Sequence, residues 1–286
     1  MNSRMLITGA PGNVGSEVVS GLQAKGIPFR VGARNTDKAR QSLGPTVEIT
    51  QFDFLKPETY EAAFSGIERL FLVRPPALAN VQRDIAPAIQ AAIKAGVTQI
   101  VFLSLQGVEK NSIVPHHKIE QIIMESGIHY TFLRASFFMQ NLSTTQAAEI
   151  KDYSEISLPV GNAKTSFIDV RDIAAVAVYA LTENYDENHT YTLTGKEALD
   201  YYQVSDKLSS VLNRPIRYTN PSLFHFVWKQ LASGRKLGYT LVVAGLYTLT
   251  RFGNAKEITY DVEMVLGREP ISFDQFAQDY LHYWQA

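Results

Sequence analysis

The chain has 286 residues and a formal net charge of −1, with 27 Lys and Arg against 28 Asp and Glu. This balance leaves no electrostatic footprint for nucleic acid or for an anionic membrane surface. The chain has no cysteine, which excludes disulfides, thiolate catalysis and cysteine metal sites and fits a reducing cytoplasm. We therefore expect a cytoplasmic protein without nucleic-acid or membrane partners.

Residues 5–15 combine an apolar strand, a glycine-rich turn and the start of an amphipathic helix. Gly9, Gly12 and Gly15 have a spacing that lets the backbone turn tightly, approach a pyrophosphate and pack a helix onto a sheet. The helix N-terminus then offers free N–H groups and a positive dipole to the phosphates. A tight turn without a ligand is the alternative. The predicted dinucleotide contacts come from Thr8, Gly9, Pro11, Gly12, Asn13 and Val14.

Short β-rich runs alternate with helical patterns through the first half of the chain, which is typical of a parallel sheet covered on both faces. The expected strands are 5–8, 29–33, 47–52, 69–73, 99–104 and 130–134. The expected helices are 13–25, 36–42, 57–64, 80–95 and 115–126. The pattern predicts an α/β Rossmann fold with a doubly wound parallel sheet and right-handed crossovers.

The regular alternation weakens after about residue 140. A strand followed by a helix is expected from residue 166, a strand over 191–195, helices from 200, a strand over 214–218 and a terminal helix from 272. We divide the chain into a Rossmann domain, 1–150, and a smaller interleaved α+β lobe, 151–286, for the substrate, with the strand near 190–194 returning to the main sheet. The apolar run 239–250 is too short to span a bilayer, so we expect a buried helix or a cover over a pocket.

The end of the second strand predicts which nicotinamide cofactor is bound. NAD-binding units normally carry an acidic residue here for the ribose hydroxyls. In this chain Arg34 follows the strand, Lys38 lies one helical turn later, and the first acid is Asp37. A guanidinium suits the 2′-phosphate of NADP(H), which we therefore favour over NAD(H). An ordinary surface arginine beside a helix start is the alternative.

The next two strand ends add candidate cofactor contacts. Asp53 and Phe54 are placed to contact the adenine ring, although plain capping of a strand end would look the same. Val73, Arg74 and Pro75 close the fourth strand, where the order of the sheet reverses. Ligands bind in that crevice.

The tyrosine acid of short-chain dehydrogenases is missing, because none of the 14 tyrosines has a lysine four residues later. Its region instead carries Ser104 and a helix with His116 and Glu120, one turn apart. An imidazole held by a carboxylate can orient a substrate or donate a proton near neutral pH. We name His116, Ser104 and Glu120 as candidate catalytic residues. An ordinary helix-face pair and a strand-end hydroxyl are the alternatives, and no metal site is expected.

Residues 134–141 follow the sixth strand, where the backbone should lie near the nicotinamide. The aromatic residues and Met139 could form an apolar wall for the substrate, or pack at a domain junction. The predicted cofactor contacts from this segment are Ser136, Phe137 and Phe138.

Together these motifs resemble the NmrA-like branch of atypical short-chain dehydrogenases, over essentially the whole chain. Within that branch, the helix with His116 and Glu120 is similar to type 2 NAD(P)H quinone oxidoreductases. Related isoflavone and phenylcoumaran reductases place a catalytic lysine where His116 stands, and Lys118 is offset from it by two residues. The motifs that carry the resemblance are Gly9-x-x-Gly12-x-x-Gly15, Arg34, the absent Tyr-x-x-x-Lys, His116–Glu120, Ser136–Asn141 and Leu266–Phe273.

The leading functional hypothesis is an NADPH-dependent oxidoreductase that passes hydride to a quinone, azo compound or conjugated carbonyl. Such electron-poor acceptors need mainly placement and a hydrogen bond, because the cofactor carries the redox chemistry. The resemblance also admits a non-catalytic NADP(H)-binding sensor, since NmrA-type regulators bind dinucleotide and reduce nothing. An epimerase or dehydratase acting on a nucleotide sugar is a weaker third hypothesis. We expect a monomer or a homodimer with a small-molecule substrate.

Overall fold

The computed structural model describes residues 4–183 and 187–285, and its contacts form two compact units. The first unit comprises Met1–Ala135, Val170–Leu193 and Asp261–Arg268. The second comprises Ser136–Asp169, Thr194–Tyr260 and Glu269–Ala286. Within the described ranges, every helix is too short or too polar to cross a lipid bilayer.

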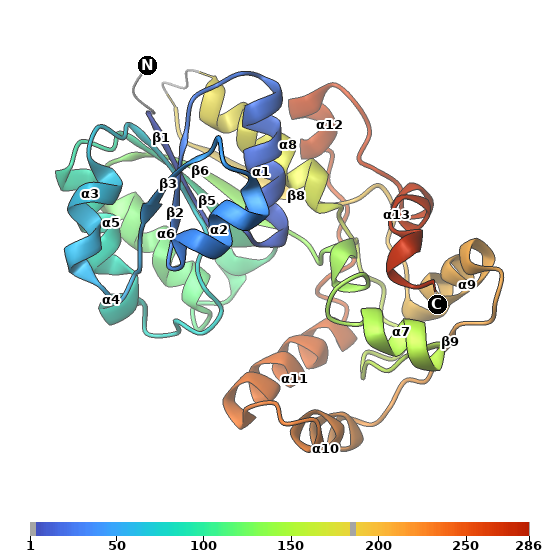
Figure 1. Cartoon of the computed structure of the whole chain (residues 1–286). Coiled ribbons are helices and arrows are strands. Elements are labelled where there is room, and N and C mark those ends of the chain that lie inside the picture. The colour runs from blue at the N-terminus through green and yellow to red at the C-terminus, as the bar shows by residue number, and fades with distance from the viewer. Residues whose placement is uncertain (1–3, 184–186, 286) are drawn as a thin grey trace. The chain divides into compact units, whose positions relative to one another are not determined.

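The first unit is built on one seven-stranded parallel sheet with the order β3-β2-β1-β4-β5-β6-β8 (Figure 1). The direction of strand succession reverses between β1 and β4, which creates a crevice at the carboxyl ends of these two strands. The expected Rossmann fold is confirmed, and β8 pairs with β6. The strands are β1 (Met5–Thr8), β2 (Arg30–Ala33), β3 (Glu48–Gln51), β4 (Arg69–Leu72), β5 (Gln99–Leu105), β6 (His129–Ala135) and β8 (His189–Leu193).

The helices of the first unit lie close to their expected positions, with one correction. The helix expected over 80–95 is two helices, because Pro87 near the start of the second has no N–H to continue the hydrogen-bond ladder. These helices are α1 (Asn13–Ala24), α2 (Thr36–Leu43), α3 (Tyr60–Phe64), α4 (Val81–Asp84), α5 (Ala86–Lys94), α6 (Pro115–Glu125), α8 (Val170–Thr182) and α12 (Asp261–Leu266).

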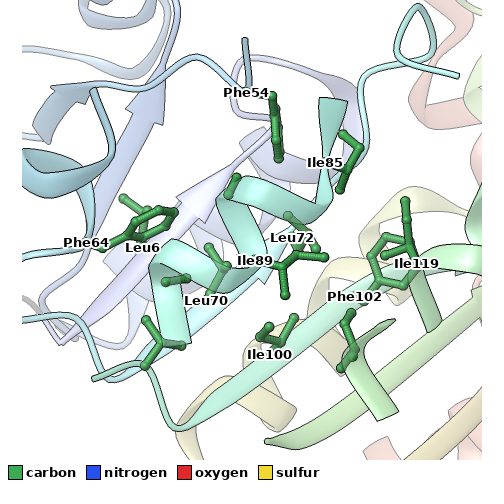
Figure 2. Packing of buried hydrophobic residues seen from close by; sticks show 14 of the residues in the cluster. Leu6, Phe54, Phe64, Leu70, Leu72, Ile85, Ile89, Ile100, Phe102 and Ile119 are labelled. Atoms are coloured by element: carbon green, nitrogen blue, oxygen red, sulfur yellow. The ribbon is translucent and has the colours of Figure 1, made fainter. Parts of the chain in front are cut away.

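A hydrophobic cluster joins the sheet to α3, α5 and α6 (Figure 2). Leu6 and Leu70 come from adjacent strands, Ile89 from α5 and Ile119 from α6. Helices α1 and α8 pack against each other and contribute nothing to this cluster. The cluster fixes the strand ends from which the candidate site is built.

The second unit has a small parallel pair, β7 (Glu155–Ile156) with β9 (Arg217–Tyr218), surrounded by helices. The strand expected from residue 166 is only an isolated bridge between Phe138 and Ile168, and that expected over 214–218 shortens to β9. Buried Trp284 donates its indole N–H to the carbonyl of Leu142, 2.8 Å away. The helices are α7 (Ala147–Tyr153), α9 (Tyr201–Leu212), α10 (Leu223–Ala232), α11 (Leu237–Arg251) and α13 (Phe273–Asp279).

The apolar run 239–250 does form a helix, α11, but the expectation of a buried helix is wrong. Its inward positions carry Thr240 and Ala244, whereas Leu241 and Val242 are exposed. Val243 and Tyr247 pack against the core of their own unit, whereas the exposed side chains of α11, Leu241, Val242, Leu246 and Leu249, point away from it.

Candidate functional site

The turn between β1 and α1 is fixed by contacts with the end of β4. The Thr8 hydroxyl donates to the carbonyl of Phe71 and accepts the N–H of Val73, both at 2.9 Å. Gly9 follows with φ +76°, in the left-handed region, and a Cβ added there would lie 2.7 Å from the Cβ of Val73. Only glycine meets both requirements, so the crevice between β1 and β4 is shaped around this residue.

The rest of the turn leaves a cradle at the start of α1. A Cβ on Gly12 would lie 2.8 Å from the carbonyl oxygen of Gly9, and one on Gly15 would lie 2.6 Å from the same atom. Gly12 is the N-cap and offers no side chain to the first N–H groups of the helix, whose first turn also has no acid. Pro11, Gly12 and Asn13 are exposed, whereas Val14 is buried and can contribute only its backbone. The cradle therefore fits a phosphate held by main-chain N–H groups.

Arg34 and Lys38 form a basic group at the end of β2. Arg34 is exposed directly after the strand, and Asn35 caps α2 by accepting the N–H of Lys38 at 2.9 Å. Lys38 is exposed in the first helical turn, beside Asp37. Both cations are exposed at this strand end, and their role at a 2′-phosphate stays a prediction.

The side chain of Phe54 has a different place from the one expected. Only 6% of it is exposed, and its ring packs edge-on against Phe52 with centroids 4.8 Å apart. The predicted contact of this ring with adenine is therefore not supported, because the ring belongs to the core. Asp53 remains half-buried at the strand end, where its carboxylate accepts the N–H of Leu55.

Arg74 lies directly after the end of β4, next to Val73 and Pro75. One terminal nitrogen of its guanidinium donates to the carbonyls of Pro75, Pro76 and Leu78 at 3.0–3.1 Å. Its Nε is buried and has no hydrogen-bond partner among the described residues. Burial lowers the pKa of this side chain. The arginine thus stabilises its own loop and brings positive charge to the crevice.

His116 lies in the first turn of α6, directly after Pro115. Its ring stacks on Phe102, with centroids 5.8 Å apart and an interplanar angle of 27°. Burial, together with the positive charge of Arg74, lowers the pKa of His116 to about 3. The imidazole is therefore neutral near pH 7, which favours the expected role of orienting a substrate over that of donating a proton.

Glu120 does not form the expected pair with His116. It is 1% exposed and accepts the hydroxyl hydrogen of Ser104 at 2.6 Å. Arg134 on β6 binds both carboxylate oxygens, at 3.1 and 2.7 Å, and also donates to Glu109. The one hydroxyl hydrogen of Ser104 is thus directed to Glu120 and away from a substrate carbonyl. This network ties α6 to β5 and β6, and we name it the Glu120 network.

Arg134 is a structural residue of the Glu120 network that the sequence interpretation missed. The signal was a cation near the end of the sixth strand, since a half-buried arginine needs an acidic partner. The partner could not be identified from spacing, because Glu120 lies on a different element.

Ser136, Phe137 and Phe138 begin the second unit, directly after β6. The Ser136 and Ser166 hydroxyls are 3.1 Å apart, and the backbone of Phe138 bridges to Ile168. Within that unit, the segment is therefore held by main-chain pairing and a buried hydroxyl pair. The role of these three residues at the cofactor stays a prediction.

Comparison with known proteins decides the family. The profile of the NmrA-like family matches residues 1–269. This chain belongs to the NmrA-like family. The resemblance drawn from the glycine turn and the strand-end residues is thereby confirmed.

Members of known activity or structure are similar over nearly the full length. An NAD(P)H azoreductase from Xenophilus azovorans is 36% identical over 280 residues, which cover 96% of each chain. The NADPH-dependent quinone oxidoreductase QOR2 from Escherichia coli, complexed with NADPH, has a TM-score of 0.86 and 23% identity, covering 97% of this chain and 99% of that one. The triphenylmethane reductase from Citrobacter sp., complexed with NADP(H), has a TM-score of 0.84 and 23% identity, covering 98% and 100%. These two structures share the fold of this family member.

Proposed function

We propose that this protein is an NAD(P)H-dependent oxidoreductase that prefers NADPH and reduces a small electron-poor acceptor such as a quinone, azo compound or conjugated carbonyl. The observation that carries the proposal is the glycine cradle between β1 and α1, because a Cβ on Gly9, Gly12 or Gly15 would collide with its walls. The 36% identical relative named as an azoreductase supports the reaction class.

The residues of the crevice fit a phosphorylated dinucleotide. Backbone N–H groups at Asn13 and Val14 would hold the pyrophosphate at the N-terminus of α1, because the N–H of Gly12 already donates to the carbonyl of Gly9. Arg34, with Lys38 beside it, would bind the 2′-phosphate. Asp53 would face the adenosine, with only the backbone of Phe54 beside it.

The remaining site residues position the acceptor and do not move its protons. When bound, the cofactor supplies a hydride from its nicotinamide ring. His116 stays neutral and offers a hydrogen bond, while the charge of Arg74 favours an acceptor that gains electrons. Ser104 and Glu120 hold α6 in place through the Glu120 network, so the proton that completes the reduction comes from solvent.

A sensor that binds NADP(H) without turnover is the second candidate. The observation that favours it is that Ser104 and Arg134 both donate hydrogen bonds to Glu120. Two of the three residues expected to be catalytic are thereby committed to structure. Both candidate functions include the binding of NADP(H). They differ in whether the protein oxidises the bound NADPH.

The deciding experiment measures NADPH oxidation by the purified protein against a panel of quinones, azo dyes and enals. Turnover on at least one acceptor, faster with NADPH than with NADH, supports the reductase. Binding of NADPH without oxidation on every acceptor supports the sensor. The absence of NADPH binding would refute both.

A further inference from the structure

The helical hairpin α10–α11 in the second unit has a surface unlike the rest of the protein. It exposes the large apolar side chains of both helices, several of them by more than half of their area. Phe224 is 82% exposed, Trp228 60% and Phe252 78%. Single exposed apolar residues are ordinary, but a contiguous apolar patch marks an interaction site. The members of this hairpin patch are Leu223, Phe224, Trp228, Leu231, Leu237, Leu241, Val242, Leu246, Leu249 and Phe252.

The two helices pack through their other faces. Phe226 of α10 is buried and meets Tyr247 of α11 edge-on, with ring centroids 5.5 Å apart. At 100° per residue, Phe224 and Trp228 lie on the side of α10 opposite Phe226. Within the described part of the chain, buried Thr240 leaves its hydroxyl oxygen without a partner on the inward side of α11. Phe226 and Tyr247 therefore face inward, whereas Phe224 and Trp228 face outward.

The segment that carries the hairpin patch is basic in sequence, although Lys229 of α10 is paired with Glu149 from outside it. Residues 207–256 contain eight Lys and Arg and no Asp or Glu. Arg235 and Lys236 lie between the two helices and are exposed, and exposed Arg251 ends α11. The formal charge of −1 for the whole chain does not reveal this basic segment, because the remaining residues are net acidic.

From this surface we infer that the α10–α11 hairpin docks the protein on an anionic lipid surface, with its exposed aromatic and aliphatic side chains entering the headgroup boundary. Helices with Trp, Phe and Leu on one side and Lys or Arg beside them lie in the membrane interface without spanning it. Basic residues add attraction to anionic headgroups that falls off within a Debye length. The inference revises the expectation of no membrane partner, which rested on the overall charge.

A second copy of the chain fits the hairpin patch less well than an anionic lipid surface does. A two-fold contact brings the same patch against itself. Arg235 and Lys236 of each copy would then add like charges to that contact. An anionic surface instead neutralises these charges and buries the same apolar side chains.

The test uses the full-length protein and vesicles of phosphatidylcholine, alone or mixed with phosphatidylglycerol. We expect the protein to float with the anionic vesicles at low salt, to be released by salt, and to float poorly with the neutral ones. The chain has two tryptophans, of which Trp284 is fully buried and Trp228 exposed. Binding should therefore shift tryptophan emission to shorter wavelength in the parent protein and not in Trp228→Phe.

Two double variants separate charge from apolar contact. Arg235→Glu with Lys236→Glu should lower partitioning onto anionic vesicles by about thirtyfold or more. The matched control, Lys56→Glu with Lys94→Glu, changes two exposed lysines of the first unit by the same charge and should lower it far less. Phe224→Ser with Trp228→Ser should abolish the emission shift and weaken binding, whereas Tyr260→Ser with Met264→Ser, both 71% exposed, should not.

The inference is overturned if the protein does not associate with anionic vesicles at low salt, or if Phe224→Ser with Trp228→Ser binds them as well as the parent. Self-association that the same double variant removes, without vesicle binding, would assign the patch to a second copy instead. Each variant should bind NADPH like the parent, which would show that it is folded.

Discussion

Gly9 and Val73 meet across the crevice between β1 and β4, where a Cβ on Gly9 would lie 2.7 Å from the Cβ of Val73. The contact joins the glycine turn to the strand end that carries Arg74. It explains why glycine is needed at this position even before any cofactor binds.

Gly9→Ala should lower the free energy of unfolding by at least about 2 kcal/mol, because left-handed strain adds to overpacking against Val73. Gly26→Ala is the matched control, since Gly26 has φ +65° but open space around it and should show strain alone. Val73→Ala should recover part of the loss in Gly9→Ala. Urea unfolding measures all of these changes, and equal losses in Gly9→Ala and Gly26→Ala would contradict the contact.

Arg34→Ala should raise the dissociation constant for NADPH by about tenfold to a hundredfold, as expected for a lost charged hydrogen bond. The dissociation constant for NADH should stay within about twofold, because NADH has no 2′-phosphate. Arg40→Ala, which changes an exposed arginine in the following helix α2, is the control. Fluorescence titration with both cofactors measures these dissociation constants. An equal loss of affinity for NADH would show that Arg34 does not bind the 2′-phosphate.

His116 should make stability depend on pH. Its pKa of about 3 in the folded protein lies below the ordinary value of 6.5, so the unfolded chain binds more protons between these values. The resulting stability is complete above about pH 6.5 and is lost as the pH falls toward about 3, by at most ~1.4 kcal/mol per pH unit. His116→Gln should remove this part of the slope, whereas exposed His129→Gln should not. Urea unfolding across this pH range tests it, and an unchanged slope in His116→Gln would disprove the neutral, half-buried ring.

The same neutral ring predicts a flat rate profile near neutrality. If His116 orients the acceptor through a hydrogen bond, His116→Ala should lower kcat/KM and His116→Gln should restore part of it. Because no imidazolium is involved, the parent rate should not fall between pH 6 and 8 with a histidine-like midpoint. Full turnover in His116→Ala would exclude any role for this side chain.

Removing one partner of the Glu120 network should be costly. Glu120→Ala leaves Arg134 without its main partner and should destabilise the fold by about 3–5 kcal/mol. The exposed pair Arg4 and Glu68, 3.3 Å apart, is the comparison, and Glu68→Ala should cost at most about 1 kcal/mol. Thermal and urea unfolding measure both variants, and comparable small losses would show that the Glu120 network contributes little.

The sheet and the glycine turn could be predicted because their signals are local. Apolar β-rich runs, the glycines and the basic residue after β2 each lie within a few positions of the structure that they specify. Pro87 is an equally local signal for the break between α4 and α5. A single helix over 80–95 is nevertheless the expectation from the apolar pattern of these residues. Local patterns thus predicted the fold and the cofactor crevice.

What could not be predicted depends on contacts between distant elements. Glu120 is one helical turn from His116, yet its buried carboxylate pairs with Ser104 on β5 and Arg134 on β6. Phe54 looked free at a strand end, but the aromatic cluster with Phe52 buries it. Helix α11 looked like a core helix, because its composition does not reveal which face packs inward.

The most direct test mixes the protein in excess with a limiting amount of NADPH and one acceptor from the quinone, azo and enal panel, and follows both absorbances together. The proposed function predicts that one NADPH is oxidised for each two-electron reduction of the acceptor, and that NADH reacts more slowly. NADPH that remains bound and unoxidised with every acceptor would contradict the assignment as a reductase.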